Sequence, residues 1–158
     1  MGPVSTQPTV AGSLTFLLGK VGGTARARFA AKLAPYGLKP RHCAVLELAG
    51  AAARTQLELA TLIGVTPSVV VDMLDELEQL DAIQRVPQPG DRRRRVVELT
   101  PAGRRLAARA GTAAHEVDEE LLGELAPDLR AAFRAALEQV GAAEGLDYSP
   151  GRGPGYSG

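Results

Sequence analysis

The sequence predicts a mainly α-helical fold with one small β-hairpin. Over most of positions 13–143, apolar residues recur every three or four positions, the spacing of helices that bury one face. Only the short runs 83–86 and 96–99 resemble strands, and a Pro- and Gly-containing segment joins them. With 158 residues, 45% of them hydrophobic, the chain can bury one core, so we expect a single domain at 13–144. The ends, 1–12 and 145–158, are expected to be disordered.

The first two helices are predicted from the residues at their ends. Ser13 suits the N-cap of a helix that Gly37 ends, because serine accepts from free first-turn amides and glycine adopts the left-handed conformation. Pro40 then opens a second helix, since proline is tolerated at the first helical position. Two helices therefore precede the middle of the chain.

A helix-turn-helix is predicted from position 55 onward. Thr55 and Glu58 form a capping box that starts a short helix, and Gly64 ends it. After one valine, Thr66 and Pro67 supply the N-cap and first position of the next helix. Two short helices with so short a connection are typical of a helix-turn-helix.

The second helix of this pair has one apolar face. Val70, Leu74 and Leu77 are spaced at i, i+4 and i+7, so they are expected to pack inward. If the opposite side enters a DNA groove, serine can bond a base or phosphate and valine can touch a thymine methyl. The residues expected to point outward are Pro67, Ser68, Val71, Asp72 and Asp75. The candidate DNA contacts at this end of the helix are Thr66, Pro67, Ser68, Val71 and Asp72.

The stretch GDRRRRVVELTPAG at 90–103 places four arginines at the tip and on the return strand of the hairpin: Arg92, Arg93, Arg94 and Arg95. Such a run alone would be a solvated turn, and a nuclear address would sit in an exposed linker. Directly after a helix-turn-helix, the run instead predicts a wing. A helix can then lie in the major groove while the hairpin reaches the minor groove, whose negative potential attracts arginine.

Two further helices complete the predicted fold, a winged helix-turn-helix with additional helices at both ends. Thr100 and Pro101 begin a long helix to about position 125. Pro127 breaks it and starts a last helix to about position 143.

Charge is segregated along the chain although the net charge is zero. Positions 82–109 carry eight arginines against two acids, and 20–54 carry seven basic residues against one acid. By contrast, 72–81 carry five acids and no base, and 115–147 carry nine acids and two arginines. The basic part is the one expected to meet a polyanion.

Several classes of protein are excluded by what the sequence lacks. One cysteine, Cys43, and two histidines, His42 and His115, are too few for a structural zinc site, and no phosphate loop or nucleophile elbow is present. We therefore expect no enzyme activity, no metal and no cofactor. The first ten residues lack a secretory signal, and no apolar run would span a membrane, so a cytoplasmic location is expected.

At 55–106 the chain resembles the MarR family (multiple antibiotic resistance regulators), and the similarity extends over about 13–143. The family's wing pattern is Asp-x-Arg, apolar residues, then Leu-Thr-x-x-Gly, met here by Asp91, Arg93, Val96, Leu99, Thr100 and Gly103. The resemblance implies a winged helix-turn-helix at about 38–100 and dimerisation helices at about 13–36 and 101–144.

The resemblance also implies a function and roles for single residues. Asp91 would pair with a wing arginine and shape the turn, and Arg93 would enter the minor groove. The protein would be a homodimeric repressor that binds a pseudo-palindromic site in double-stranded DNA and responds to a small aromatic or anionic ligand. Candidates to line the ligand pocket of such a regulator are Phe29, Tyr36 and His42.

Two residues depart from the family. Asp72 stands where a basic residue is frequent, and an acid near phosphate is repulsive unless it receives from a cytosine amine, pairs with an arginine or lies clear of the DNA. Asp81 replaces the usual glycine, and aspartate tolerates the left-handed conformation that this turn needs. The wing, together with arginines such as Arg54, is then expected to carry much of the affinity.

Two alternative functions follow from other features. Cys43, expected to be a small buried hydrophobe, would be a redox-sensing thiol if Arg41 and His42 activated it. The acidic outer face around Asp72 and Asp75 would instead dock a basic protein partner. In that second case the winged helix would be an interaction module and would not bind DNA.

Overall fold

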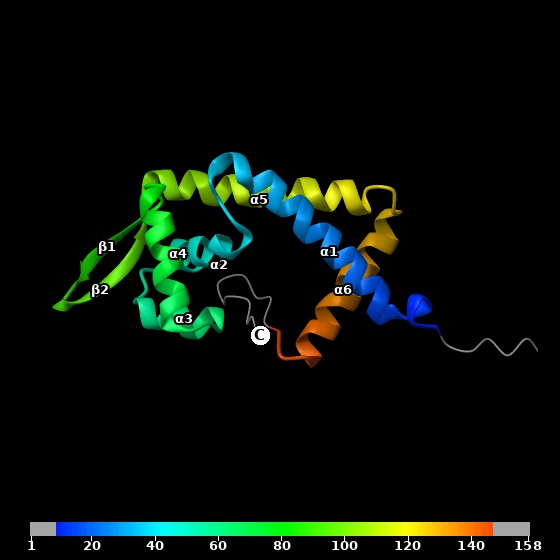
Figure 1. Ribbon diagram of the computed structural model, residues 1–158, viewed down its shortest axis with the longest axis horizontal. Helices are drawn as coiled ribbons and strands as arrows, with labels where there is room; N and C mark the ends of the chain where they lie inside the picture. The colour runs from blue at the N-terminus through cyan, green and yellow to red at the C-terminus, as the bar shows by residue number, and fades with distance from the viewer. Residues whose placement is uncertain (1–8, 147–158) are drawn as a thin grey trace, which may run out of the picture.

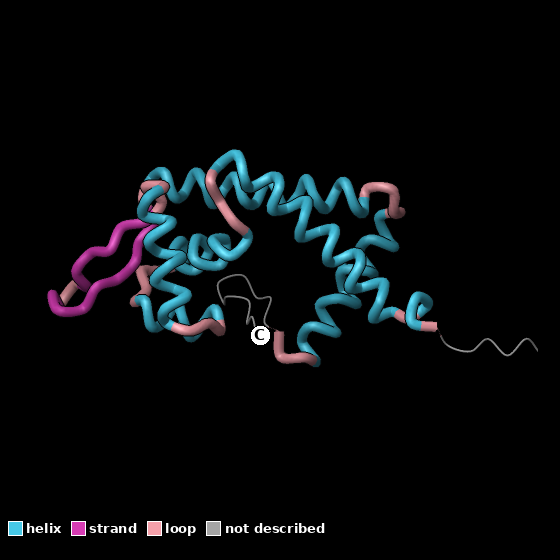
Figure 2. Tube along the Cα trace, viewed as in Figure 1, coloured by secondary structure: helices cyan, strands magenta, loops and turns pink. Residues whose placement is uncertain are grey.

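The computed structural model describes residues 9–146 and confirms a mainly helical chain with one antiparallel hairpin (Figures 1 and 2). The helices are α1 (Leu14–Leu33), α2 (Pro40–Ala51), α3 (Gln56–Ile63), α4 (Pro67–Gln79), α5 (Pro101–Leu122) and α6 (Pro127–Ala143). The strands are β1 (Ile83–Gln88) and β2 (Asp91–Leu99), and the short 3-10 helices are η1 (Val10–Gly12) and η2 (Ala34–Tyr36).

The molecule is elongated along α5, as Figure 1 shows. The hairpin projects from one end beside α3 and α4, whereas α6 lies at the other end, and α1 runs against α5. Ion pairs fix this second end: Lys32 of α1 bonds Glu116 at 2.9 Å and Glu120 at 2.7 Å, and Arg130 of α6 bonds Glu119 at 2.6 Å. The wing and the α6 end are thus held apart by one long helix.

The predicted helix ends are largely those of the structure. Ser13 and Thr55 cap α1 and α3 with their hydroxyl groups, and the capping box at Thr55 and Glu58 is formed in both directions. Gly37 and Gly64 adopt left-handed conformations after η2 and α3. Thr66 stands at the N-cap of α4, but its hydroxyl lies 3.0 Å from the Ser68 hydroxyl and makes no cap bond.

Several boundaries differ from the prediction. Helix α1 ends at Leu33, and the 3-10 helix η2 leads on to Gly37, while β1 extends to Gln88. Helix α5 ends at Leu122, three residues before the predicted end. Strand β2 begins at Asp91 and not near position 96, so all four arginines lie on the return strand. Val10–Gly12 forms a 3-10 helix within the expected disordered end, and the rest of that prediction, 1–8 and 147–158, lies outside the described residues.

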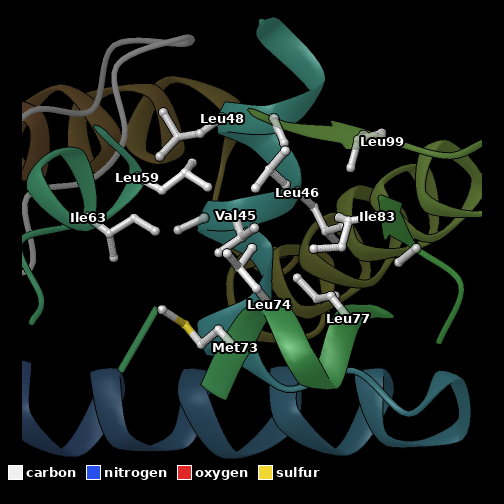
Figure 3. Packing of buried hydrophobic residues seen from close by; sticks show 14 of the residues in the cluster. Val45, Leu46, Leu48, Leu59, Ile63, Met73, Leu74, Leu77, Ile83 and Leu99 are labelled. Atoms are coloured by element: carbon white, nitrogen blue, oxygen red, sulfur yellow. The ribbon is translucent and has the colours of Figure 1, made fainter. Parts of the chain in front are cut away.

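The core joins the helix-turn-helix to the base of the hairpin (Figure 3). Helix α2 contributes Val45, Leu46 and Leu48 to this core. These side chains pack against α3, the predicted apolar face of α4 and the hairpin. The partners from α3 and the hairpin are Leu59, Ile63, Ile83 and Leu99. The predicted inward residues of α4 are fully buried, and Met73 joins them. Burial of each such side chain contributes about 1.5–3 kcal/mol, so α4 is fixed firmly on its inner face.

A second set of contacts fixes the hairpin to α5. The Thr100 hydroxyl donates to the carbonyl of Asp81 at 2.5 Å and accepts from the amide of Gly103 at 2.9 Å. Asp81 has φ +53, which confirms the left-handed turn predicted for it. The amide of Thr100 also donates to the carbonyl of Ala82 at 3.1 Å. One threonine therefore joins the end of α4, the wing and the start of α5.

No single helix in the described part of the chain is long and apolar enough to span a membrane. Only α3 and α4 taken together, bent by 111°, reach that length and composition.

Candidate nucleic-acid interface and ligand cavities

The outer side of α4 carries the residues predicted to face DNA. Pro67, Ser68 and Asp72 are exposed, as expected, whereas Val71 is only half-exposed. Asp75 and Glu78, one and two turns beyond Val71, pair with the wing, so this side of the helix faces β1. Val69, on the opposite side of the helix, is 39% exposed.

Arg85 of β1 forms ion pairs with two acids of α4. Its Nη2 lies 2.6 Å from Asp75 Oδ1, and its Nη1 lies 2.8 Å from Glu78 Oε2. Arg85 is only partly exposed, so solvent screens these pairs less than a pair on the open surface. These two ion pairs therefore connect strand β1 of the wing to the second half of α4.

Glu76 joins α4 to the start of α2. Its Oε1 accepts from Lys39 at 2.8 Å and from Arg41 at 2.5 Å, and its Oε2 lies 2.6 Å from Nε2 of His42. The other ring nitrogen of His42 accepts from the Lys39 amide at 3.1 Å. The proton of the neutral ring is thus assigned to Nε2, which donates to Glu76.

Acid is expected to lower the free energy of unfolding through His42 and Glu76. Burial holds the pKa of His42 below its ordinary 6.5, and Arg41, Lys39 and His42 hold the pKa of Glu76 at about 2. The unfolded chain then binds more protons than the folded chain, so stability falls as the pH drops below 6.5 and again below 4.5. Denaturant unfolding between pH 7.5 and 3 measures this loss.

The matched variant for this prediction is Glu76→Gln. It should reduce the slope of the curve below pH 4.5, because the Glu76 carboxylate contributes to that part together with other acids of lowered pKa such as Glu119 and Glu120. An identical pH dependence in the variant would contradict the assignment of this step to Glu76.

The wing turn is shaped by Asp91. Its Oδ1 accepts from the backbone amide of Arg93 at 3.0 Å, the geometry of an Asx turn. The implied pair between Asp91 and a wing guanidinium is not formed within residues 9–146. The four arginines are exposed and make no ion pair within that range, although Arg95 donates to the carbonyl of Arg85 at 3.4 Å.

A shallow depression separates the wing from the two helices. Its volume is about 450 Å³, and it is lined by Thr55, Gln56, Leu57, Pro67, Arg94 and Arg95. The first turns of α3 and α4 meet there, where unpaired amides and the helix dipole attract anions. Two guanidinium groups beside two helix N-termini make this depression suitable for a DNA phosphate.

Arg54 lies at the base of the wing. Its amide donates to the carbonyl of Val97 at 3.3 Å, and the Val97 amide donates back at 2.7 Å, so residue 54 extends the hairpin sheet by one bridge. Glu58 has its pKa lowered, first by hydrogen bonds from Thr55 and then by Arg94 and Arg54. The predicted basic residues Arg54 and Arg94 are therefore brought to the same region.

The three predicted pocket residues are not brought together. Phe29 lines a cavity of about 100 Å³ between α1, α2 and α5. Tyr36 lines a separate open groove with Arg105 and Arg109, whose guanidinium lies 5.9 Å from the Tyr36 ring centre. His42 is 1% exposed and belongs to the Glu76 cluster. Other residues that line the Phe29 cavity are Cys43, Leu46, Glu47, Ala107, Ala110, Gly111 and Ala114.

The environment of Cys43 opposes the redox alternative. Burial, with a smaller effect of Glu47, raises the pKa of the thiol to about 11. Because the thiolate is the species that peroxide oxidises, little of the reactive form is present near neutral pH. The predicted activation by Arg41 and His42 is not among the causes of this shift.

Arg85 and Glu76 are not predicted from the sequence as members of the site. The available signal in the sequence is the contrast between α4, which has no basic residue, and the basic residues at 39–42, at the start of α2. Such a contrast indicates pairing between elements, but it does not say which acid meets which base.

Comparisons with known proteins agree with this geometry. A family model described as MarR family matches residues 36–94. The HTH-type transcriptional repressor Rv2887 of Mycobacterium tuberculosis (strain ATCC 25618 / H37Rv) is 31% identical over 129 residues, which cover 81% of this chain and 93% of that repressor.

Two solved structures are similar over most of the chain. Rv2887 from Mycobacterium tuberculosis in complex with DNA has a TM-score of 0.69 and 30% identity, covering 82% of this chain and 98% of that one. CouR from Rhodococcus jostii RHA1 bound to p-coumaroyl-CoA has a TM-score of 0.69 and 29% identity, covering 85% of this chain and 95% of that one.

Proposed function

The chain belongs to the MarR family, and from this premise we propose that it is a sequence-specific DNA-binding transcriptional regulator, a ligand-responsive repressor that acts as a homodimer. Its relative Rv2887 is a transcriptional repressor whose structure is solved with DNA. The protein acts by occupying DNA in the cytoplasm, and the proposal assigns it no catalytic reaction.

The exposed arginines of the wing are the main support for DNA binding. Four exposed arginines lie on a hairpin next to α4, and none is neutralised within residues 9–146. The acids of α4 closest to the wing are paired with Arg85, so they do not compete for these guanidinium groups. We assign Arg93 to the minor groove, α4 to the major groove, and Arg54, Arg92, Arg94 and Arg95 to phosphates.

Exposed apolar surface at the end of the molecule opposite the wing supports a homodimer. Leu14 is 76% exposed and Val140 is 58% exposed, and neighbouring apolar residues on α1 and α6 are exposed as well. A single soluble chain seldom exposes so much contiguous apolar surface. Burial against a second copy removes it from water and presents two wings to a site with two-fold symmetry.

The ligand response is assigned to the cavity at Phe29. Its walls come from α1, α2 and α5, so an occupant contacts both the dimer end and the DNA-binding end. Its lining is apolar apart from Cys43 and Glu47, which suits an aromatic ring, and an anionic group of the ligand must lie away from Glu47. Rv2887, the relative that is also solved with salicylic acid, binds a small aromatic anion.

Arg93→Ala tests the proposal. With the DNA directly upstream of the protein's own gene as duplex, the variant should bind about tenfold or more weakly, because it loses a groove contact. Gel-shift titration measures the change. A protein-docking module would be indifferent to this substitution.

The matched control is Arg134→Ala. Arg134 is also an exposed arginine, but it lies on α6, at the end of the molecule opposite the wing. This variant removes the same charge and should bind the duplex as the wild type does. Equal losses in both variants would mean that only net charge matters, and equal binding by Arg93→Ala and wild type would refute the wing assignment.

A further inference from the structure

The acids of α4 are not equivalent in the structure. The helix carries four acids and no lysine or arginine, which is unexpected for a helix that faces a polyanion. Asp75 and Glu78 are both paired with Arg85, and Glu76 is paired with Lys39 and Arg41. Within residues 9–146, Asp72 is the one acid of α4 that makes no ion pair and no side-chain hydrogen bond.

Asp72 is also the acid placed nearest to where bases are contacted. It is exposed, and it lies one turn after Ser68 on the outward face. The first residues of a recognition helix are those that reach base edges. Asp75 lies three residues after Asp72, and its carboxylate pairs with Arg85 instead. A free carboxylate therefore lies within the segment that enters the major groove.

The chemistry of a carboxylate limits what it can contact there. An ionised carboxylate only accepts hydrogen bonds. In the major groove, guanine presents two acceptors and thymine presents one acceptor and a methyl group, so both repel it or leave it unsatisfied. Adenine offers an amine, but the neighbouring N7 acceptor faces the second carboxylate oxygen. Cytosine offers its N4 amine without an adjacent acceptor on the same base.

We propose that Asp72 reads a C·G base pair at one position of each half-site by accepting a hydrogen bond from cytosine N4. This inference rests on the proposed function, since it requires α4 to lie in the major groove. The carboxylate also discriminates against the other base pairs, because there it loses water and meets either no amine donor or, at adenine, an amine beside an acceptor that repels the second oxygen. Asp72 thus adds selectivity to a protein whose wing arginines supply affinity.

Selection from a randomised duplex library tests the inference, with the full-length protein and three variants. The wild type should enrich a two-fold symmetric site with C·G at one position in each half. Asp72→Ala should enrich the same site with no preference at that position. Asp72→Asn should change the preferred pair there to A·T, because asparagine bonds adenine N6 and N7 together.

The matched control is Glu124→Gln, which also removes one exposed acid but lies between α5 and α6, away from α4 and the wing. It should retain the C·G preference. Competition with duplexes changed at that single position should give the wild type a preference of about tenfold, which falls to near one in Asp72→Ala.

Two outcomes would overturn the inference, and they are distinguishable. If Asp72→Ala and Asp72→Asn select the wild-type site and merely bind all duplexes more tightly, Asp72 only repels DNA, and the proposed function stands. If the wild type enriches no duplex at all, the proposed function itself fails and the inference fails with it.

Discussion

Raising the salt concentration from 50 to 200 mM is expected to weaken duplex binding by about 10³–10⁵-fold, the loss for a protein that contacts roughly 6–10 phosphates. The proposed phosphate contacts are made by residues at the wing and its base, namely Arg54, Arg92, Arg94 and Arg95. Two protomers would bring about eight such arginines to the DNA, which is within that range.

The slope of the logarithm of the binding constant against the logarithm of salt concentration measures this effect. A double variant, Arg94→Ala with Arg95→Ala, removes four phosphate contacts from a dimer and should reduce the slope by about 4. The Arg134→Ala control should leave the slope unchanged. A nearly flat dependence for the wild type would contradict DNA binding through the wing arginines.

Gly103→Ala is expected to lower the free energy of unfolding by about 3 kcal/mol, at the upper end for overpacking. A Cβ at position 103 would overlap the carbonyl oxygen of Ala82, which is backbone and already accepts from Thr100. Neither partner can move without breaking the junction between α4, the wing and α5. Chemical unfolding at a fixed protomer concentration measures the loss, since a dimer's stability depends on concentration.

Gly111→Ala provides the matched control on the same helix. A Cβ at position 111 meets nothing within 4 Å, so the variant gains helix propensity and should be more stable by about 0.5–1 kcal/mol. The two variants each add one methyl group to α5 with opposite expected signs. A small or favourable effect at Gly103 would show that the junction yields easily and would contradict the tight contact at Ala82.

Most of the fold is predictable because its signals are local. Capping residues, left-handed glycines and prolines act within one helical turn, so the ends of α1, α3 and α4 follow from single residues such as Ser13 and Thr55. Asp81 is a case in point, since its φ of +53 is the conformation that the turn requires of any residue there. The order of helices and hairpin could therefore be predicted without any knowledge of tertiary contacts.

The pairing of charges could not be predicted in the same way. Arg41 and Glu76 are 35 residues apart, and only the packing of α2 on α4 decides that they meet. The same packing directs His42 toward Glu76 and away from the cavity at Phe29. A prediction from periodicity places a residue on a helix face, but the neighbouring element decides what that face contacts.

Helix α5 can act as a lever. It begins at the wing junction and ends among ion pairs to α1 and α6, and its 22 residues span about 33 Å. If the far end is held in the dimer, a tilt of about 6° displaces the wing end by about 3.4 Å, which is the rise of one base pair. The cavity at Phe29 lies against the middle of this lever. A ligand that tilts α5 by a few degrees is enough to move a wing out of register with its half-site.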